Sequence, residues 1–176
     1  MLNNVKTFSA TNIIIFITII VYFLQHSIQN GSIILGLNIY FLKYGFYWQP
    51  LTTIFTHSGM MHIAMNMFIL FQFGNLIEQI FGIKKFIFIY LVGGVLTSLA
   101  SFVFMQKFGM AHNLVGASGA ISVIMGFIAL KDKYQRSGMI VWILLISFAP
   151  LLLGMPIAWY AHLLGFIFGW LMGYII

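Results

Sequence analysis

Residues 137–176, SGMIVWILLISFAPLLLGMPIAWYAHLLGFIFGWLMGYII, contain no charged side chain in 40 positions. About 20 apolar residues form a helix that crosses the roughly 30 Å hydrocarbon core of a bilayer, so this stretch is too long for one crossing. The Gly-Met-Pro run at 154–156 interrupts it, and glycine and proline favour a turn there. The stretch therefore predicts two membrane-spanning helices, near residues 138–153 and 158–176.

Four charge-free stretches precede this one, separated by single charges or short charged clusters. Each has room for one apolar helix, which places four more spans near residues 12–27, 59–80, 86–105 and 117–131. The chain is therefore predicted to be an all-α membrane protein, a bundle of six transmembrane helices in a single domain over residues 1–176.

The composition agrees with this prediction and excludes several chemistries. Hydrophobic residues make up 62% of the 176 residues and charged residues 6%, whereas soluble domains are about one quarter charged. The absence of cysteine excludes a thiol nucleophile, a disulfide and a thiolate metal site. Glu78 and Asp132 are the only acids, which leaves no pair of neighbouring carboxylates for acid–base catalysis.

The basic residues predict the orientation, because cytoplasmic loops are enriched in Lys and Arg. With the N-terminus inside, the inner side holds six of them: Lys6, Lys84, Lys85, Lys131, Lys133 and Arg136. The outer side holds Lys43 and Lys107, so both termini are expected in the cytoplasm. This topology and attraction to anionic lipid account for the net charge of +6, so no nucleic-acid partner is expected. The first apolar run lacks a small-x-small cleavage site and is expected to be retained.

The connection between the first two spans, residues 29–58, is unusually long. Most links between packed helices take 2–8 residues, whereas this one takes about 30. It contains Phe46, Tyr47 and Trp48, aromatic residues that suit the interface between lipid and water. We expect a long outer loop that lies partly in the membrane.

Polar residues inside spans indicate function, because burying them in hydrocarbon is costly. His62 and Asn66 share one face near the start of the second span, Ser118 begins the fourth, and His162 begins the sixth. Ser118 precedes Lys131 by 13 residues, or about 20 Å of helix, which places it in the outer half of the membrane. Because these three spans run in the same direction, the four side chains are expected to meet near the outer face.

This set favours acyl transfer by a serine nucleophile. A serine hydroxyl requires a base to accept its proton, and His162 is the candidate base for Ser118. His62, Asn66 and the Ser118 backbone N–H are candidate donors for an oxyanion hole. Glu78 lies 16 residues after His62, about 24 Å along the helix, so no carboxylate reaches the site. A Ser–His dyad is therefore predicted.

The nearby glycines and His57 are expected to support the site. Gly116 and Gly119 allow close approach to Ser118, while Gly165 and Gly169 allow the fourth and sixth spans to pack closely. His57 has two interpretations, a structural hydrogen bond or a catalytic role, of which the first is favoured. The histidines could also suggest zinc, but the helical His-Glu-x-x-His pattern is missing and no acid is near. No metal and no organic cofactor are expected.

Three motifs together resemble the rhomboid intramembrane serine proteases: His62-x-x-x-Asn66, Gly116-Ala117-Ser118-Gly119 and Ala161-His162-x-x-Gly165-x-x-x-Gly169. The resemblance implies the family's minimal six-helix form, with a water-accessible catalytic cavity open to the outer side. It implies Ser118 as nucleophile, His162 as base, and His62, Asn66 and the Ser118 N–H as oxyanion hole. Through Gly74-x-x-x-Glu78 it implies a structural role for Glu78. The fifth span and the loop after it would form a substrate gate.

Two positions depart from the family pattern. The usual Trp-Arg of the first loop is Trp48-Gln49, which puts the hydrogen bonding of that loop in question. An aromatic that stacks on the catalytic histidine is replaced by Ser122, so His162 is either less constrained or hydrogen-bonded to Ser122.

The expected function is an intramembrane serine endopeptidase that cleaves transmembrane segments of other proteins in a bacterial plasma membrane. Two alternatives stay open. One is a catalytically silent relative that binds transmembrane segments, although such proteins usually lack the nucleophile or the base. The other is a small transporter or channel, although neither repeat symmetry nor intramembrane charge is visible.

Overall fold

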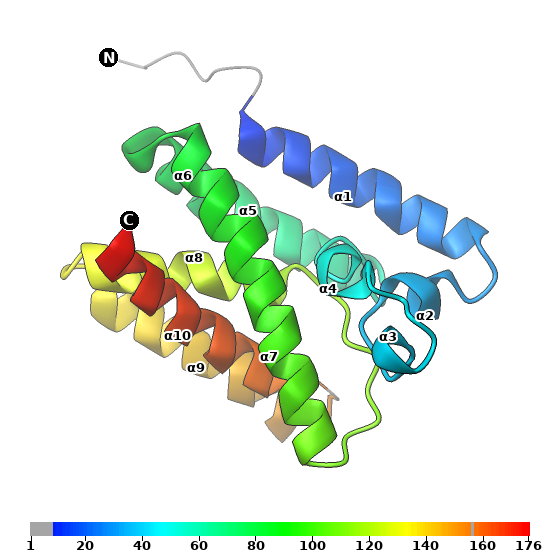
Figure 1. Cartoon of the computed structure of the whole chain (residues 1–176). Coiled ribbons are helices and arrows are strands. Elements are labelled where there is room, and N and C mark those ends of the chain that lie inside the picture. The colour runs from blue at the N-terminus through cyan, green and yellow to red at the C-terminus, as the bar shows by residue number, and fades with distance from the viewer. Residues whose placement is uncertain (1–8, 156) are drawn as a thin grey trace.

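The computed structural model describes residues 9–155 and 157–176, so Lys6 and Pro156 lie outside the described residues. The described chain is helical and contains no β-strand (Figure 1). Its helices are α1 (Ala10–Ser27), α2 (Gly31–Leu35), α3 (Tyr40–Lys43), α4 (Gln49–Thr52), α5 (Met60–Phe81), α6 (Ile83–Ile87), the π-helical turn η1 (Phe88–Val92), α7 (Gly93–Lys107), α8 (Ser118–Lys131), α9 (Arg136–Leu152) and α10 (Trp159–Ile175). The all-α prediction is confirmed.

The long helices coincide with the six predicted spans to within about three residues at each end. Three continuous helices, Ala10–Ser27, Met60–Phe81 and Ile83–Lys107, are long and apolar enough to cross a membrane. The helices Ser118–Lys131, Arg136–Leu152 and Trp159–Ile175 are apolar but shorter. At 1.5 Å per residue the 14-residue α8 is about 21 Å long, less than the hydrocarbon thickness. Six complete crossings therefore stay a prediction.

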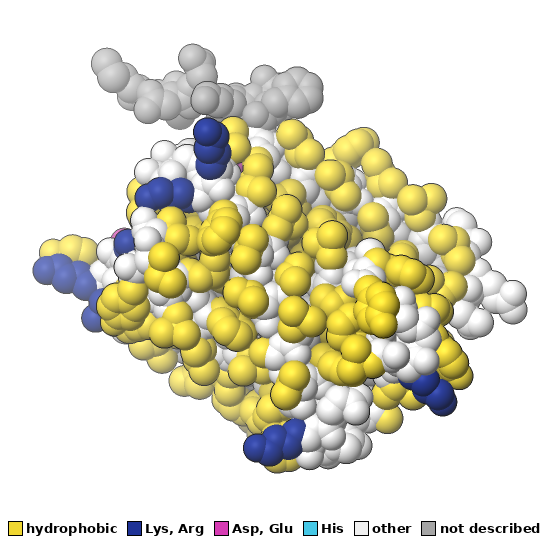
Figure 2. Space-filling view, viewed as in Figure 1, with side chains coloured by type: hydrophobic (Ala, Val, Ile, Leu, Met, Phe, Trp, Pro, Cys, Tyr) yellow, Lys and Arg dark blue, Asp and Glu magenta, His cyan; other side chains and the backbone are white. Residues whose placement is uncertain are grey.

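The surface is that of an integral membrane protein. Figure 2 shows apolar side chains across most of the visible face, with Lys and Arg gathered toward its edges. Phe16 on α1, Phe68 on α5 and Val103 on α7 are each more than 60% exposed. Such a continuous apolar surface is stable in contact with lipid, whereas water would make it aggregate.

Helix α8 is the centre of the bundle. Every residue from Ala120 to Ala129 is buried, and α5, α7, α9 and α10 pack around it (Figure 1). A helix that is apolar on all sides is typically enclosed by other helices. The first residue of α8, Ser118, is thereby held at a fixed place inside the protein.

Helices α8 and α10 pack closely through small residues, as expected from the spacing of Gly165 and Gly169. A Cβ built on Gly165 would meet the carbonyl oxygen of Gly119, and one on Gly169 would meet that of Val123. Gly126 on α8 faces the carbonyl of Phe166 in the same way. These glycines bring the two backbones together without side chains between them, which is how small residues stabilise helix pairs in membranes.

The long first connection contains the short helices α2, α3 and α4. Gln49 is fully buried and donates to the carbonyl oxygens of Ile33 (3.0 Å) and Ile34 (3.3 Å), while its own oxygen accepts from Asn38 N–H (3.3 Å). Trp48 donates to the Ile34 carbonyl at 3.0 Å. The glutamine that departs from the family pattern thus provides hydrogen bonds inside this loop.

Glu78, near the end of α5, binds the first turn of α1. Its carboxylate accepts from the backbone N–H groups of Ala10 (3.1 Å) and Thr11 (2.9 Å) and from the Thr11 hydroxyl (3.0 Å). The first N–H groups of a helix have no partner within the helix, and a negative charge there is favourable. Glu78 therefore ties α1 to α5.

Replacing Glu78 by Ala is expected to lower the stability of the detergent-solubilised protein by about 2 kcal/mol, because charged hydrogen bonds to the α1 terminus are lost. The midpoint of thermal unfolding measures this effect. Gln72→Ala, at an exposed position of the same helix, is the control and should leave the midpoint unchanged. Equal midpoints for the two variants would contradict the assigned role.

Candidate active site

Ser118 and His162 lie within hydrogen-bonding distance. The Nε2 of His162 is 3.0 Å from the Ser118 hydroxyl oxygen, across the α8–α10 contact. His162 is buried at 8% exposure, whereas Ser118 is partly exposed. The sequence predicted that these two residues would meet, although they are 44 positions apart.

The local backbone presents Ser118 at a helix N-terminus. Ser118 is the first residue of α8, and the N–H groups of a first helical turn have no partner within the helix. Gly116, two residues earlier, has φ +125°, a conformation that residues with a Cβ rarely adopt. The glycine therefore allows the chain to turn sharply just before α8 begins at Ser118.

His62 and Asn66, one turn apart on α5, approach the same turn. A Cβ on Gly116 would lie 2.9 Å from His62 Nε2, too close for the ring to keep its place, and 3.7 Å from Asn66 Nδ2, an ordinary contact distance. The Asn66 amide nitrogen is buried and has no hydrogen-bond partner among the described residues. His62 is anchored through its Nδ1, 3.0 Å from the Ser58 hydroxyl. A buried donor without a partner is able to bind an oxygen atom that a substrate brings.

His57 makes a structural contact to the same turn. Its Nε2 accepts a hydrogen bond from the Ala117 backbone N–H at 3.3 Å. The side-chain amide of Gln25 on α1 makes two hydrogen bonds to the His57 backbone. Its oxygen accepts from the His57 N–H at 3.0 Å, and its nitrogen donates to the His57 carbonyl. Burial, followed by the nearby His62 ring, lowers the pKa of His57 to about 4 and so keeps the ring neutral. With its proton on Nδ1, which lies 3.3 Å from the Phe55 carbonyl oxygen, the neutral ring leaves Nε2 free to accept. The geometry matches the hydrogen-bonding interpretation of His57.

The hydroxyl of Ser122 bonds to the Ser118 backbone and not to the His162 ring. It donates to the carbonyl oxygen of Ser118 at 2.7 Å, one turn earlier in α8. Of the two possibilities drawn from the sequence, a Ser122–His162 hydrogen bond is therefore not the arrangement in this structure. The Nδ1 of His162 is buried and lacks a hydrogen-bond partner within the described part of the chain.

Neither Glu78 nor Asp132 contacts Ser118 or His162 in this structure. Glu78 binds α1, and an Asp132 oxygen accepts from the backbone N–H groups of Tyr134 (2.8 Å) and Gln135 (3.3 Å) beyond the far end of α8. The structure therefore places no carboxylate beside His162 among the residues that it describes.

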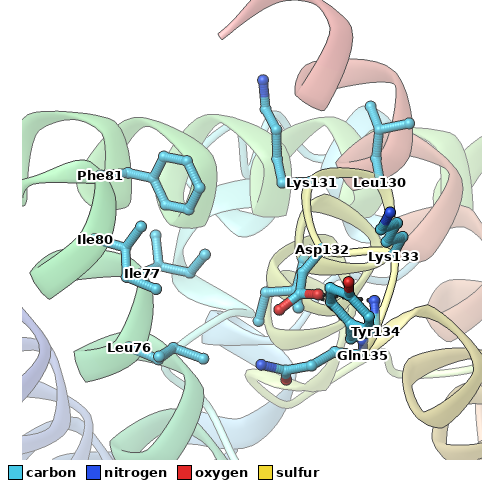
Figure 3. A pocket seen from close by; sticks show the side chains of 11 residues that line it. Leu76, Ile77, Ile80, Phe81, Leu130, Lys131, Asp132, Lys133, Tyr134 and Gln135 are labelled. Atoms are coloured by element: carbon cyan, nitrogen blue, oxygen red, sulfur yellow. Dashed lines mark hydrogen bonds between the residues drawn. The ribbon is translucent and has the colours of Figure 1, made fainter.

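Two cavities lie away from Ser118. One of about 450 Å³ is at the opposite end of α8, where Leu76, Ile80 and Phe81 of α5 face the turn at Asp132 (Figure 3). A smaller one of about 180 Å³ lies between the first loop and residues 111–113. Since neither is lined by Ser118 or His162, the expected water-accessible cavity at the dyad stays a prediction.

Several supporting contacts had no signal in the sequence. The bonds of Gln25 to His57 and of Glu78 to α1 join segments 32 and 67–68 residues apart, and no spacing rule predicts them. The polar amide of Gln25 stands out near the end of a mostly apolar segment, but its partner cannot be read from the sequence.

Comparisons with known proteins support the resemblance. The family model of the Rhomboid domain matches residues 44–176. The chain is 32% identical over 136 residues to the mitochondrial Presenilin-associated rhomboid-like protein A of Danio rerio, covering 68% of this chain and 35% of that protein. It is 37% identical over 92 residues to Rhomboid protease GluP of Bacillus subtilis, covering 51% of this chain and 17% of that protein.

A third relative matches over more of its own length. Rhomboid protease GlpG of Haemophilus influenzae is 26% identical over 137 residues, covering 73% of this chain and 69% of that protein. The chain thus spans only about a third of the Danio rerio protein and a sixth of the Bacillus subtilis protein. These relatives include proteins named as proteases and proteins named only as rhomboid-like.

Proposed function

This chain belongs to the rhomboid family, and from that premise we propose that it is an intramembrane serine endopeptidase. The observation that carries the proposal is the 3.0 Å contact between the Ser118 hydroxyl and His162 Nε2 at the N-terminus of a buried helix. A hydroxyl next to an unprotonated imidazole nitrogen is the arrangement that activates serine for attack.

The proposed reaction is hydrolysis of a peptide bond through an acyl-enzyme. His162 accepts the Ser118 proton while the serine oxygen attacks the scissile carbonyl carbon. The Ser118 N–H, the Asn66 amide and His62 stabilise the oxyanion that forms. His162 then returns the proton to the departing amine, and a water molecule, activated by the same imidazole, releases the acyl group.

The proposed setting is a six-span bundle with the dyad in the outer half of the membrane and both termini in the cytoplasm. The substrates would be transmembrane segments of other proteins, and α9 with the following loop would admit them. Surrounding lipid would solvate the apolar surface, part of the first loop would lie in the membrane, and water would enter from the outer side. The bacterial plasma membrane remains the proposed location, although the relatives include mitochondrial proteins.

The second candidate is a silent relative that binds transmembrane segments without cleaving them. Rhomboid-like names among the relatives keep this function open. The contact between Ser118 and His162 favours catalysis, because a binding protein has no need for a hydroxyl against an imidazole nitrogen.

Cleavage in liposomes distinguishes the two functions. The purified protein is reconstituted with single-span substrates that carry small residues near the outer end of the span, and products are detected by mass spectrometry. We expect cleavage by the wild type and none by Ser118→Ala. Cleavage that persists in Ser118→Ala would contradict the proposal, and binding without cleavage by the wild type would favour the silent relative.

Replacing Asn66 by Ala is expected to lower kcat by about 100-fold with little change in KM, because an oxyanion donor acts on the transition state. The liposome assay measures both constants. Met65→Ala, at an exposed position of the same helix, is the control and should retain wild-type activity. A rise in KM with kcat unchanged would show that Asn66 binds substrate and not the oxyanion.

A further inference from the structure

The Ser118–His162 pair leaves one proton unaccounted for. If His162 Nε2 accepts the serine proton, a neutral ring must carry its own proton on Nδ1. That nitrogen is buried without a hydrogen-bond partner among the described residues, and no carboxylate lies beside it. Buried donors are nearly always paired, so an acceptor for Nδ1–H is expected nearby.

Helix α9 offers a carbonyl group at this place. In an α-helix the carbonyl of residue 146 accepts from the N–H of residue 150, but residue 150 is a proline inside α9 and has no N–H. The carbonyl of Ile146 therefore lacks its usual helical partner. Helix α9 packs on α10, and the Ile146 backbone lies near the His162 ring without a hydrogen bond to Nδ1 in this structure.

The burial pattern of α9 agrees with this placement. Ile143 and Ser147 are buried, and Ile146 and Pro150 are partly buried, so the four residues form one face at helical spacing. The flanking residues Leu144, Leu145 and Phe148 are exposed and would face lipid. Pro150 thus frees a carbonyl on the side of α9 that packs against the bundle.

We propose that the Ile146 carbonyl, released by Pro150, holds the Nδ1 proton of His162 and acts as a main-chain third member beside Ser118 and His162. This inference rests on the proposed function. Pro150 is then a positioning residue, because it acts only through the imidazole. The arrangement provides what a carboxylate provides in other serine hydrolases, a fixed tautomer and a fixed ring orientation, without a charge inside the membrane.

The test is Pro150→Ala, which restores an N–H that competes for the Ile146 carbonyl. We expect labelling of Ser118 by a fluorophosphonate to slow by about tenfold or more, as losses of groups that orient a catalytic side chain usually do. The thermal unfolding midpoint should stay equal or rise, because Ala suits a helix interior better than Pro. In ¹⁵N spectra of histidine-labelled protein, the His162 signals should shift away from the Nδ1–H tautomer.

Two matched variants make the result specific. Pro50→Ala removes a proline near the start of α4, away from His162, and should label at the wild-type rate. Ser147→Ala removes the other polar group of this α9 face, whose hydroxyl is buried and has no partner in the described structure, and should also label normally. Wild-type labelling and an unchanged tautomer in Pro150→Ala would overturn the proposal. Loss of labelling in Ser147→Ala alone would assign the role to the hydroxyl instead.

The protease function and the contact between His162 and the Ile146 carbonyl give separate results in these experiments. If the wild type does not react with the probe while the His162 tautomer still depends on Pro150, the proposed protease function fails and the proton contact stands. If the wild type reacts and Pro150→Ala matches it in rate and tautomer, only the main-chain acceptor is wrong.

Discussion

Replacing His162 by Ala is expected to slow acylation of Ser118 by at least about a thousandfold, because the hydroxyl loses its base. Among the described residues, the imidazole of His162 is the one basic side chain within hydrogen-bonding distance of the Ser118 hydroxyl, at 3.0 Å. The rate of fluorophosphonate labelling measures the effect in detergent without a known substrate. Removing the imidazole leaves the α8–α10 glycine contacts intact, so the protein should still fold.

His26→Ala is the matched control for this prediction. His26 lies at the end of α1, where its Nδ1 contacts the Tyr22 carbonyl at 2.7 Å, and it has no contact with the dyad. This variant should label at the wild-type rate. A His162→Ala protein that labels within a few-fold of the wild type would remove His162 as the base.

Replacing Gly169 by Val is expected to destabilise the protein by at least about 3 kcal/mol, and to prevent folding if the helices cannot separate. The new side chain would meet the Val123 carbonyl and the Phe127 backbone nitrogen of α8, and backbone atoms cannot move aside as a flexible side chain does. The measurement is the unfolding midpoint in detergent together with the yield of monodisperse protein.

Gly138→Ala is the control, because a Cβ there meets nothing within 4 Å. It should leave the midpoint unchanged or raise it slightly, since Ala is a better helix former than Gly. If Gly169→Val were as stable as Gly138→Ala, the close α8–α10 contact would not be present in the folded protein.

The sequence predicted the main helices and the meeting of Ser118 with His162 for a physical reason. The charge-free runs locate the helices, because lipid requires a continuous apolar segment with its backbone hydrogen bonds satisfied. Helical rise then sets the depth of each polar residue. Ser118 and His162 lie at the same depth on two helices that pack closely through glycines, so their side chains are brought near each other.

Other parts could not be predicted in this way. The bond between Glu78 and the start of α1 depends on which helices are neighbours, and apolar patterns specify that weakly because lipid and protein are equally apolar. The burial of Gln49 depends on the irregular backbone of the first loop, where neither helical nor strand periodicity indicates which side chains face inward. The proline at position 150 predicts from the sequence that the Ile146 carbonyl lacks its helical partner. Whether that carbonyl faces His162 depends on the rotation of α9 about its axis, which the sequence does not specify.

Intact-mass analysis of the purified protein after reaction with a fluorophosphonate, with the modified peptide sequenced, tests directly whether Ser118 is the nucleophile. We expect one adduct per chain, on Ser118, and no adduct in Ser118→Ala. An adduct on a different residue, or none on wild-type protein that is folded, would contradict the assignment of Ser118 as the nucleophile.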